Sequence, residues 1–229
     1  MGAARSKIVL GVDGCPGGWI AARVRSSGSQ QRLIGFQVVD RLEELAADPQ
    51  VSVIAVDIPI GLPGAEGTRA CDVEARKILR PCGARVFPAP VRAALPHVDD
   101  YKAACAASRD ECGKALSKQA WNILGKIAEA DELADDPRLV ECHPEVAFAL
   151  MGDGVIAASK KSAAGRSERI ALLSAWLPAL DIAELPRGDD ALDALACAWS
   201  AVRYTEGRAR QWPAEAPRDG RGRPMRIIA

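Results

Sequence analysis

Aromatic residues are scarce in this sequence, and its charges cancel. Aromatic side chains make up 4% of the 229 residues, which argues against an extended stacking platform for single-stranded nucleic acid. The 30 basic residues equal the 30 acidic ones, so no global positive field is present for gripping long duplex non-specifically. If the protein acts on nucleic acid, the composition favours a structured, branched or small nucleotide substrate.

Long apolar runs and paired cysteine motifs are also missing. No apolar stretch approaches the roughly 20 residues of a membrane span, and Met1 to Lys7 is too short for a secretory signal. The seven cysteines are scattered, odd in number and free of any CxxC pair, which excludes a disulfide framework and a cysteine zinc site. We therefore expect a cytoplasmic protein with reduced thiols and no membrane partner.

What the sequence does contain is ordinary globular composition, with 48% apolar and 26% charged residues, and we expect residues 1–229 to form a single domain. Its first notable stretch is IVLGVDGCPGG, residues 8–18. The apolar run predicts a strand buried on both faces that ends on Asp13. Aspartate is a poor strand former, so this placement suggests a functional carboxylate. The alternative is that Asp13 and Gly14 close a tight turn.

The same pattern occurs again at residues 51–58, VSVIAVDI. This stretch also predicts a buried strand that ends on a carboxylate, Asp57, just before turn-forming residues. Between the two lie strand-like segments at 19–25 and 33–39 and a short helical pattern at 41–47. An antiparallel meander followed by a crossover helix would make the two acid-ending strands neighbours. Both acids would then lie at one edge of the sheet, although Asp57 could instead cap the following loop.

Residues 65–135 are predicted to be a mostly helical insertion after the fourth strand. Helical patterns cover residues 68–80, where Asp72 and Arg76 form an i,i+4 pair, and residues 117–133. Basic residues outnumber acidic ones between positions 69 and 92, which makes this stretch a candidate phosphate-contacting surface. A solvated helix face is the alternative. The candidate substrate-binding residues are Arg69, Arg76 and Arg92.

A short strand, LVECHP at residues 139–144, bears another acid. Because side chains alternate along a strand, Glu141 and His143 share one face and Cys142 points to the other. This excludes a Cys142–His143 nucleophilic pair. Glu141 is a candidate metal ligand and His143 a candidate proton-transfer or positioning group, unless His143 merely caps the helix that begins near Pro144.

Two further acids lie near the start of a late helix, DDALDALA from residue 189. Asp189 is a natural N-cap, and an acidic first turn is favoured by the helix dipole. Neither explanation accounts for Asp193, which lies beyond the first turn, among Ala and Leu residues and three positions after Asp190. Both carboxylates therefore emerge on one face of a core-facing helix and need a cation. The Arg-rich tail from 203 is expected to be loose until an edge strand at 225–228.

The motifs GVDGCPGGW, DIPIGLP, RACDVEAR, VFPAP, ECHPEVAF and DDALDALACAW, taken together and in order, resemble domain of unknown function 429. Members of that family are regarded as predicted nucleases of the ribonuclease H fold. The resemblance implies an α/β, ribonuclease H-like mixed sheet with flanking helices. It also implies that Asp13, Asp57, Asp190 and Asp193 match the acids of that superfamily. Asp rather than Glu at position 57 and the long helical insertion are departures that bear on substrate choice.

The implied chemistry is two-metal hydrolysis of phosphodiester bonds in nucleic acid. Mg²⁺ and Mn²⁺ prefer hard oxygen ligands, and two ions about 3.5 to 4 Å apart can activate water and stabilise the leaving oxygen. In this hypothesis, Asp13 bridges both ions, Asp57 and Asp190 hold one each, and Asp193 completes the set. Glu141 and His143 would assist.

Two other functions are compatible with these residues. GVDGCPGG could also serve an ATP-binding phosphotransferase of the actin and hexokinase type, whose domains open with an Asp followed by glycines. Against this, the chain has little room for duplicated domains and no second glycine-rich phosphate loop. A non-catalytic protein that keeps the fold for binding partners is the third possibility, and the full set of four acids argues against it.

Overall fold

The computed structural model describes residues 6–28 and 30–229. The chain divides into two compact units. The first comprises the chain up to Asp57 together with residues 137–210 and 228–229, and the second comprises residues 58–136 and 211–227. The predicted insertion therefore lies in the second unit, which also includes a C-terminal segment. Among the described residues, every helix is too short or too polar to serve as a membrane span.

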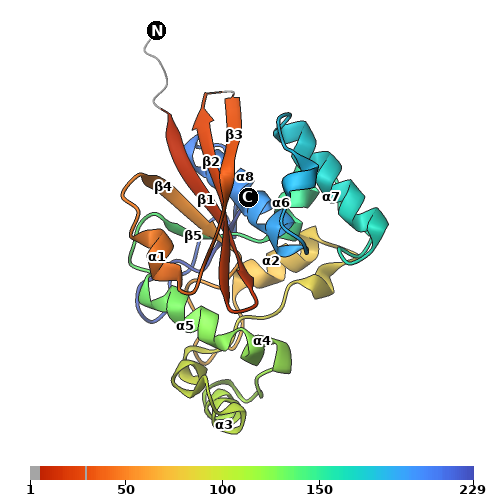
Figure 1. Ribbon diagram of the computed structural model, residues 1–229. Helices are drawn as coiled ribbons and strands as arrows, with labels where there is room; N and C mark the ends of the chain where they lie inside the picture. The colour runs from red at the N-terminus through yellow and green to blue at the C-terminus, as the bar shows by residue number, and fades with distance from the viewer. Residues whose placement is uncertain (1–5, 29) are drawn as a thin grey trace. The chain divides into compact units, whose positions relative to one another are not determined.

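The first unit is built on a five-stranded mixed sheet with the order β3-β2-β1-β4-β5 (Figure 1). The first three strands form the expected antiparallel meander, and β4 and β5 run parallel to β1. The predicted adjacency of the two acid-ending strands is confirmed, because β1 pairs directly with β4. The strands are β1 (Lys7–Cys15), β2 (Gly18–Ser27), β3 (Gln30–Val39), β4 (Val51–Val56) and β5 (Leu139–Glu141).

Strands β1 and β4 are buried as their apolar runs predict. Val9 and Val12 of β1 and Val56 of β4 have no exposed surface. Strand β4 ends at Val56, one residue before Asp57, but the Asp57 amide still donates to the Val12 carbonyl at 2.9 Å. The hydrogen bonding between β1 and β4 therefore continues up to Asp57.

Four helices belong to the first unit, and α8 is the one that packs on β1, β2 and β4. Helices α6 and α7 pack in turn against α8, and α1 packs against β2 and β3 (Figure 1). Apolar Ala and Leu side chains on α8 are buried, which explains why this helix forms against the sheet. The bounds are α1 (Leu42–Ala46), α6 (Pro144–Met151), α7 (Ala163–Trp176) and α8 (Asp190–Thr205).

The second unit is helical where the sequence predicts an insertion. The pattern at 117–133 is not one helix, because it divides at Ile123 into α4 and α5. Buried Ala104, Leu116 and Leu124 are part of a core shared by α3, α4 and α5. The α-helices are α2 (Ala70–Ile78), α3 (Tyr101–Cys112), α4 (Lys118–Asn122) and α5 (Leu124–Glu132), with 3-10 turns at Gly83–Arg85 and Arg92–His97. A further 3-10 turn, Ile182–Glu184, belongs to the first unit.

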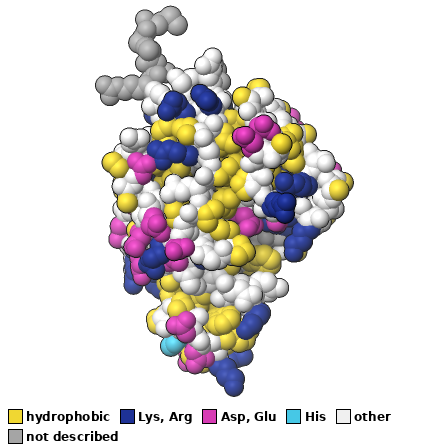
Figure 2. All heavy atoms as spheres, viewed as in Figure 1, with side chains coloured by type: hydrophobic (Ala, Val, Ile, Leu, Met, Phe, Trp, Pro, Cys, Tyr) yellow, Lys and Arg dark blue, Asp and Glu magenta, His cyan; other side chains and the backbone are white. Residues whose placement is uncertain are grey.

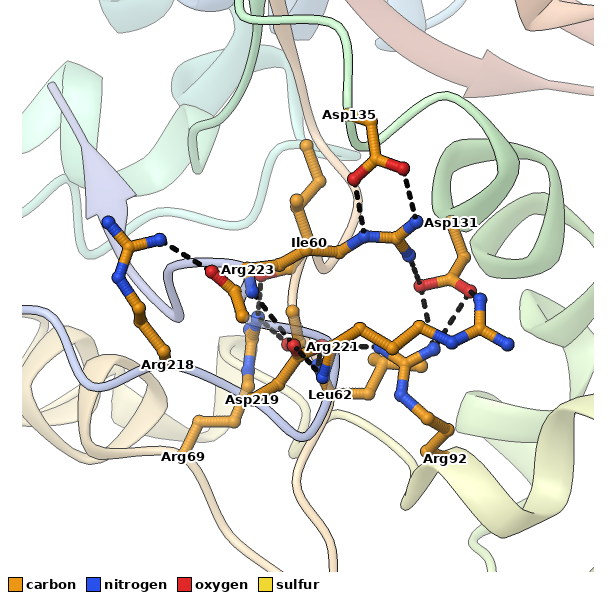
Figure 3. Close-up of polar contacts among 12 residues, drawn as sticks. Ile60, Leu62, Arg69, Arg92, Asp131, Asp135, Arg218, Asp219, Arg221 and Arg223 are labelled. Atoms are coloured by element: carbon orange, nitrogen blue, oxygen red, sulfur yellow. Dashed lines mark hydrogen bonds and ion pairs between the residues drawn. The ribbon is translucent and has the colours of Figure 1, made fainter.

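The C-terminal tail is not loose as expected. Figure 3 shows Arg221 and Arg223 of this segment directed at Asp131 of α5. Their Nη1 atoms lie 3.0 and 2.5 Å from the Asp131 carboxylate. Asp219 accepts the backbone amides of Arg223 and Leu62 at 2.9 and 3.1 Å. Burial by itself would raise the pKa of Asp219, but these hydrogen bonds outweigh burial and hold the pKa below its usual range. Short strands β6 (Gln211–Trp212) and β7 (Ile227–Ile228) pair with each other.

Candidate functional site

The first pair of predicted site residues lies at one edge of the sheet. Asp13 is the residue after Val12 on β1, and Asp57 is the residue after Val56 at the end of β4. Val12 and Val56 are register partners in this parallel pair. Strand β1 does not end on Asp13 as predicted, because it continues to Cys15 in its pairing with β2, and the turn is formed by residues 16–17 and not by Asp13 and Gly14. The parallel pairing with β4 ends at Val12 and Val56, so Asp13 and Asp57 each directly follow its last register pair.

A glycine on β1 brings the late helix to the same edge. A Cβ atom at Gly11 would lie 2.0 Å from the Ala198 amide nitrogen and 2.1 Å from the Ala194 carbonyl oxygen. No side chain fits at that separation, so the backbone of α8 rests directly on the backbone of β1. Asp193, one residue before Ala194, is 2% exposed. This close packing explains why Asp193, on a helix late in the sequence, lies next to β1 and β4, which are early in the sequence.

The electrostatics show that the four acids interact. Burial raises the pKa of Asp13 well above its usual range, and the charges of Asp57, Asp193 and Asp190 raise it further. Burial and then the Asp193 charge raise the pKa of Asp57 to about 8. Burial likewise raises the pKa of Asp193 to about 6. The structure thus brings Asp57, Asp190 and Asp193 close enough to Asp13 for each of their charges to disfavour its ionisation.

Among the described residues, Lys160 is the cation that acts on these carboxylates, and sequence reasoning missed it. The Nζ atom of Lys160 donates to Asp193 at 2.6 Å and lies 3.1 Å from Asp189. Burial opposes its charge, but the two carboxylates raise the pKa of Lys160. A single ammonium cannot neutralise four carboxylates. No pattern in the sequence marks Lys160, which belongs to a polar loop before α7 and meets α8 only through the fold.

Asp189 does not play the part predicted for it. It occupies the N-cap position of α8, but its side chain makes no capping hydrogen bond. Its carboxylate pairs with Lys160 instead, and although burial works against ionisation, this pairing lowers the pKa of Asp189.

Of the residues predicted at 139–144, Glu141 ends β5 at the acidic edge, whereas His143 lies beyond the strand, so the two do not share a strand face as expected. Glu141 is the register partner of Val56 and is 6% exposed, and its charge helps to raise the pKa of Asp57. His143 occupies the N-cap position of α6 without a side-chain capping bond, so the capping alternative is wrong. A second acid that the sequence analysis missed, Glu145, also raises the pKa of Asp57. It accepts from buried Arg169 at 2.5 Å. No sequence pattern marks it, because Glu141 lies on a strand and Glu145 in the first turn of the next helix.

The predicted substrate-binding arginines make internal contacts in the second unit. Arg69 is 1% exposed and donates to Asp72 at 2.5 Å, so Asp72 pairs with Arg69 and not with Arg76 as expected. Arg76 donates to the Val86 carbonyl at 2.9 Å. Arg92 donates to both oxygens of Asp131 (Figure 3). A role for these three residues in substrate binding stays a prediction.

The donors at the acidic edge suit a hard divalent cation in chemistry. They are carboxylate oxygens, the ligands that Mg²⁺ and Mn²⁺ prefer. Oδ1 of Asp193 is buried without a hydrogen-bond partner, and such an atom is costly unless a donor or cation meets it. In the described part of the chain, no three His, Cys, Asp or Glu side chains are arranged to hold a metal ion. In this conformation the counter-charge of Asp193 is the Lys160 ammonium.

The raised pKa values predict how the metal-free protein responds to pH. Asp57 keeps its proton in the folded state up to about pH 8, whereas an unfolded aspartate loses it near pH 4. The folded state therefore binds more protons in this window, so raising the pH destabilises it by up to about 1.4 kcal/mol per pH unit for each such group.

Thermal unfolding in EDTA between pH 5 and 8 measures this effect. We expect the melting temperature to fall with rising pH and the slope to be shallower in Asp57→Asn. Asp40→Asn is the matched control, because Asp40 is an exposed carboxylate directly after β3, and its slope should equal that of the unaltered protein. Equal slopes in all three proteins would contradict the raised pKa of Asp57.

The sheet, its flanking helices and the acidic edge define a mixed α/β protein with a carboxylate cluster. A family model described as protein of unknown function (DUF429) matches residues 11–218. The chain belongs to this family. No curated protein and no solved structure matched the chain in the corresponding comparisons.

Proposed function

We propose that this protein is a metal-dependent hydrolase that cleaves phosphodiester bonds in a short or structured nucleic acid. One observation carries the proposal. Besides burial, the charges of Asp57 at the end of β4 and Asp193 on α8 raise the pKa of Asp13 on β1, and the Asp193 charge also raises the pKa of Asp57. Clustered acids with so little positive charge among them are expensive to fold, and a divalent cation relieves that cost.

The arrangement of the sheet supports a ribonuclease H-like assignment, which is part of the proposal. An antiparallel meander is followed by two strands parallel to β1, in the order β3-β2-β1-β4-β5. Acids stand on the first strand, after the fourth and on a late helix, as the resemblance to this superfamily implies.

In the proposed site Asp13, Asp57, Asp190 and Asp193 would hold Mg²⁺ or Mn²⁺. When bound, such ions polarise the phosphodiester and lower the pKa of water so that it can attack phosphorus. The chain's own residues supply the rest. Glu141 and Glu145 keep the edge negative, and Lys160 holds one Asp193 oxygen in place at 2.6 Å. His143, beside this edge, is the candidate for moving or positioning a proton.

Metal binding is the direct test. An ion that binds only the folded state at about a hundredfold its Kd stabilises it by about 2.7 kcal/mol, which at this chain length raises the melting temperature by roughly 5 to 10 °C. We expect Mn²⁺ to produce this rise in the unaltered protein and in Asp40→Asn. In Asp13→Asn the metal-free protein should melt slightly higher, because a buried carboxyl group whose ionisation burial and the neighbouring acids disfavour is replaced by a neutral amide, and the rise on adding Mn²⁺ should be lost. An unchanged Mn²⁺ response in Asp13→Asn would place the ions elsewhere and remove the main support for the proposal.

A further inference from the structure

A cavity beside the acidic edge is lined by four basic residues, one glycine and one aspartate. Its volume is about 520 Å³, and its lining residues are Lys160, Lys161, Arg166, Arg187, Gly188 and Asp189. We refer to this set as the basic pocket. All six residues belong to the first unit. Figure 2 shows Lys and Arg side chains gathered on the part of the surface that α7 occupies in Figure 1.

The positive charge of the basic pocket is only partly neutralised. Lys160 is paired with Asp189 and Asp193. By contrast, in the part of the chain that the structure describes, the side chains of Lys161 and Arg187 make no hydrogen bond or direct ion pair. Both residues are exposed. The pocket therefore offers charged donors that its own walls do not use.

Local backbone contacts shape the basic pocket. Ser162 caps α7 by accepting the Gly165 amide at 3.1 Å, so the positive end of a 14-residue helix lies two residues after Lys160. Arg166, in the first turn of α7, donates to the Gly188 carbonyl at 2.6 Å. Gly188 has a φ of 98°, a conformation that glycine adopts most readily. This bond joins the loop before α8 to the start of α7 and holds the two walls together.

We propose that the basic pocket binds the phosphate groups of the nucleic acid backbone next to the carboxylate site. The proposal rests on the proposed function, because Lys160 and Asp189 belong to the pocket's wall and Lys160 contacts Asp193 of that site. A substrate strand that approaches the acidic edge meets ionised carboxylates such as Asp189, where burial opposes ionisation but the pairing with Lys160 lowers the pKa. These carboxylates repel the phosphate groups of the strand. The guanidinium and ammonium groups of the basic pocket attract the same phosphate groups and so offset that repulsion.

The lining also indicates what the pocket recognises. Its volume lies within the range of small-ligand sites, so it is large enough for more than a single phosphate ion. No aromatic side chain is among its lining residues, so bases have nothing to stack on. The pocket therefore reads the charged backbone and not the base sequence.

Binding of a short fluorescein-labelled single strand, measured by anisotropy in EDTA, tests the pocket without metal. We expect the double variant Lys161→Gln, Arg187→Gln to bind about tenfold or more weakly, since charge-assisted hydrogen bonds to phosphate are lost. The dependence of log K on log salt should become shallower by about 1.4, which corresponds to two fewer phosphate contacts on a single strand. Neither residue touches the four aspartates, so the Mn²⁺-induced rise in melting temperature should be unchanged.

The matched control is Arg32→Gln, an exposed arginine on β3 outside the pocket, which should bind as the unaltered protein does. Strands with and without a 5′-phosphate separate a terminal phosphate as the ligand from internal phosphodiesters. Equal affinity of the double variant and Arg32→Gln, or no binding by the unaltered protein, would contradict phosphate binding by the basic pocket. Neither result would affect the Mn²⁺ test of the proposed function. Weaker binding by the double variant in a protein that shows no Mn²⁺ response would support the pocket and count against the hydrolase.

Discussion

Asp57→Asn should abolish nucleic acid cleavage and leave the fold intact. Asp57 already favours its protonated form up to about pH 8, and asparagine resembles that form in shape and charge, so the metal-free protein loses nothing by the change. Cleavage is different, because it needs the ionised carboxylate. Removing several kcal/mol of transition-state stabilisation lowers kcat by roughly a thousandfold.

Purified protein with Mn²⁺ should be assayed on hybrids, branched junctions, hairpins and single strands. Asp40→Asn, which removes an exposed carboxylate after β3, is the matched control and should cut as well as the unaltered protein. Circular dichroism and the melting temperature check that Asp57→Asn is folded. Cleavage that survives equally in Asp57→Asn would come from a contaminant and count against the site.

A titration with ATP beside the cleavage panel separates the two enzyme classes. A hydrolase of this kind needs no nucleotide cofactor, so we expect no micromolar ATP binding. Tight ATP binding with no cleavage anywhere in the panel would favour the phosphotransferase.

Gly11→Ala should destabilise the protein more than any ordinary alanine substitution on the sheet. The new Cβ would lie 2.0 Å from the amide nitrogen of Ala198 and 2.1 Å from the carbonyl oxygen of Ala194. These are backbone atoms of α8, which cannot turn aside as a side chain can, so the whole helix must move from β1. Overpacking commonly costs about 1 to 3 kcal/mol, and we expect the upper end or more, which lowers the melting temperature by roughly 10 °C.

Gly35→Ala is the matched control, because Gly35 lies on β3 and no atom is within 4 Å of its added Cβ. Its melting temperature should change little. The Mn²⁺ response of Gly11→Ala should also weaken, since a displaced α8 carries Asp193 away from Asp13 and Asp57. Similar melting temperatures for the two variants would show that β1 and α8 do not meet as closely as described.

Local sequence pattern determined much of the sheet and its acids. Residues 8–12 and 51–56 are apolar at nearly every position, and burial on both faces is the stable outcome for such runs. An aspartate at the end of each run then had to emerge at the edge that parallel strands share. The late helix was equally readable, because buried Asp193 stands among Ala and Leu at helical spacing.

The partners of the arginines in the second unit could not be read in this way. Arg69, Arg76 and Arg92 suggested a phosphate surface by number alone, but their contacts with Asp72, the Val86 carbonyl and Asp131 depend on how the second unit packs. Periodicity also did not separate α4 from α5, because apolar spacing continues through the break at Ile123.

The surroundings of the acids were decided by tertiary structure. Lys160 and Asp193 are 33 positions apart, and the basic pocket joins residues of the loop before α7, its first turn and the loop before α8. A lysine that faces solvent cannot be distinguished in sequence from a lysine that pairs with a buried carboxylate, because the partner is set by residues that fold against it. The sequence by itself therefore determined that Asp13 and Asp57 follow neighbouring buried strands and that Asp193 lies on a core-facing helix. Only the packing of α8 on Gly11 and of α7 against α8 decided that Lys160 and Glu145 lie near these acids.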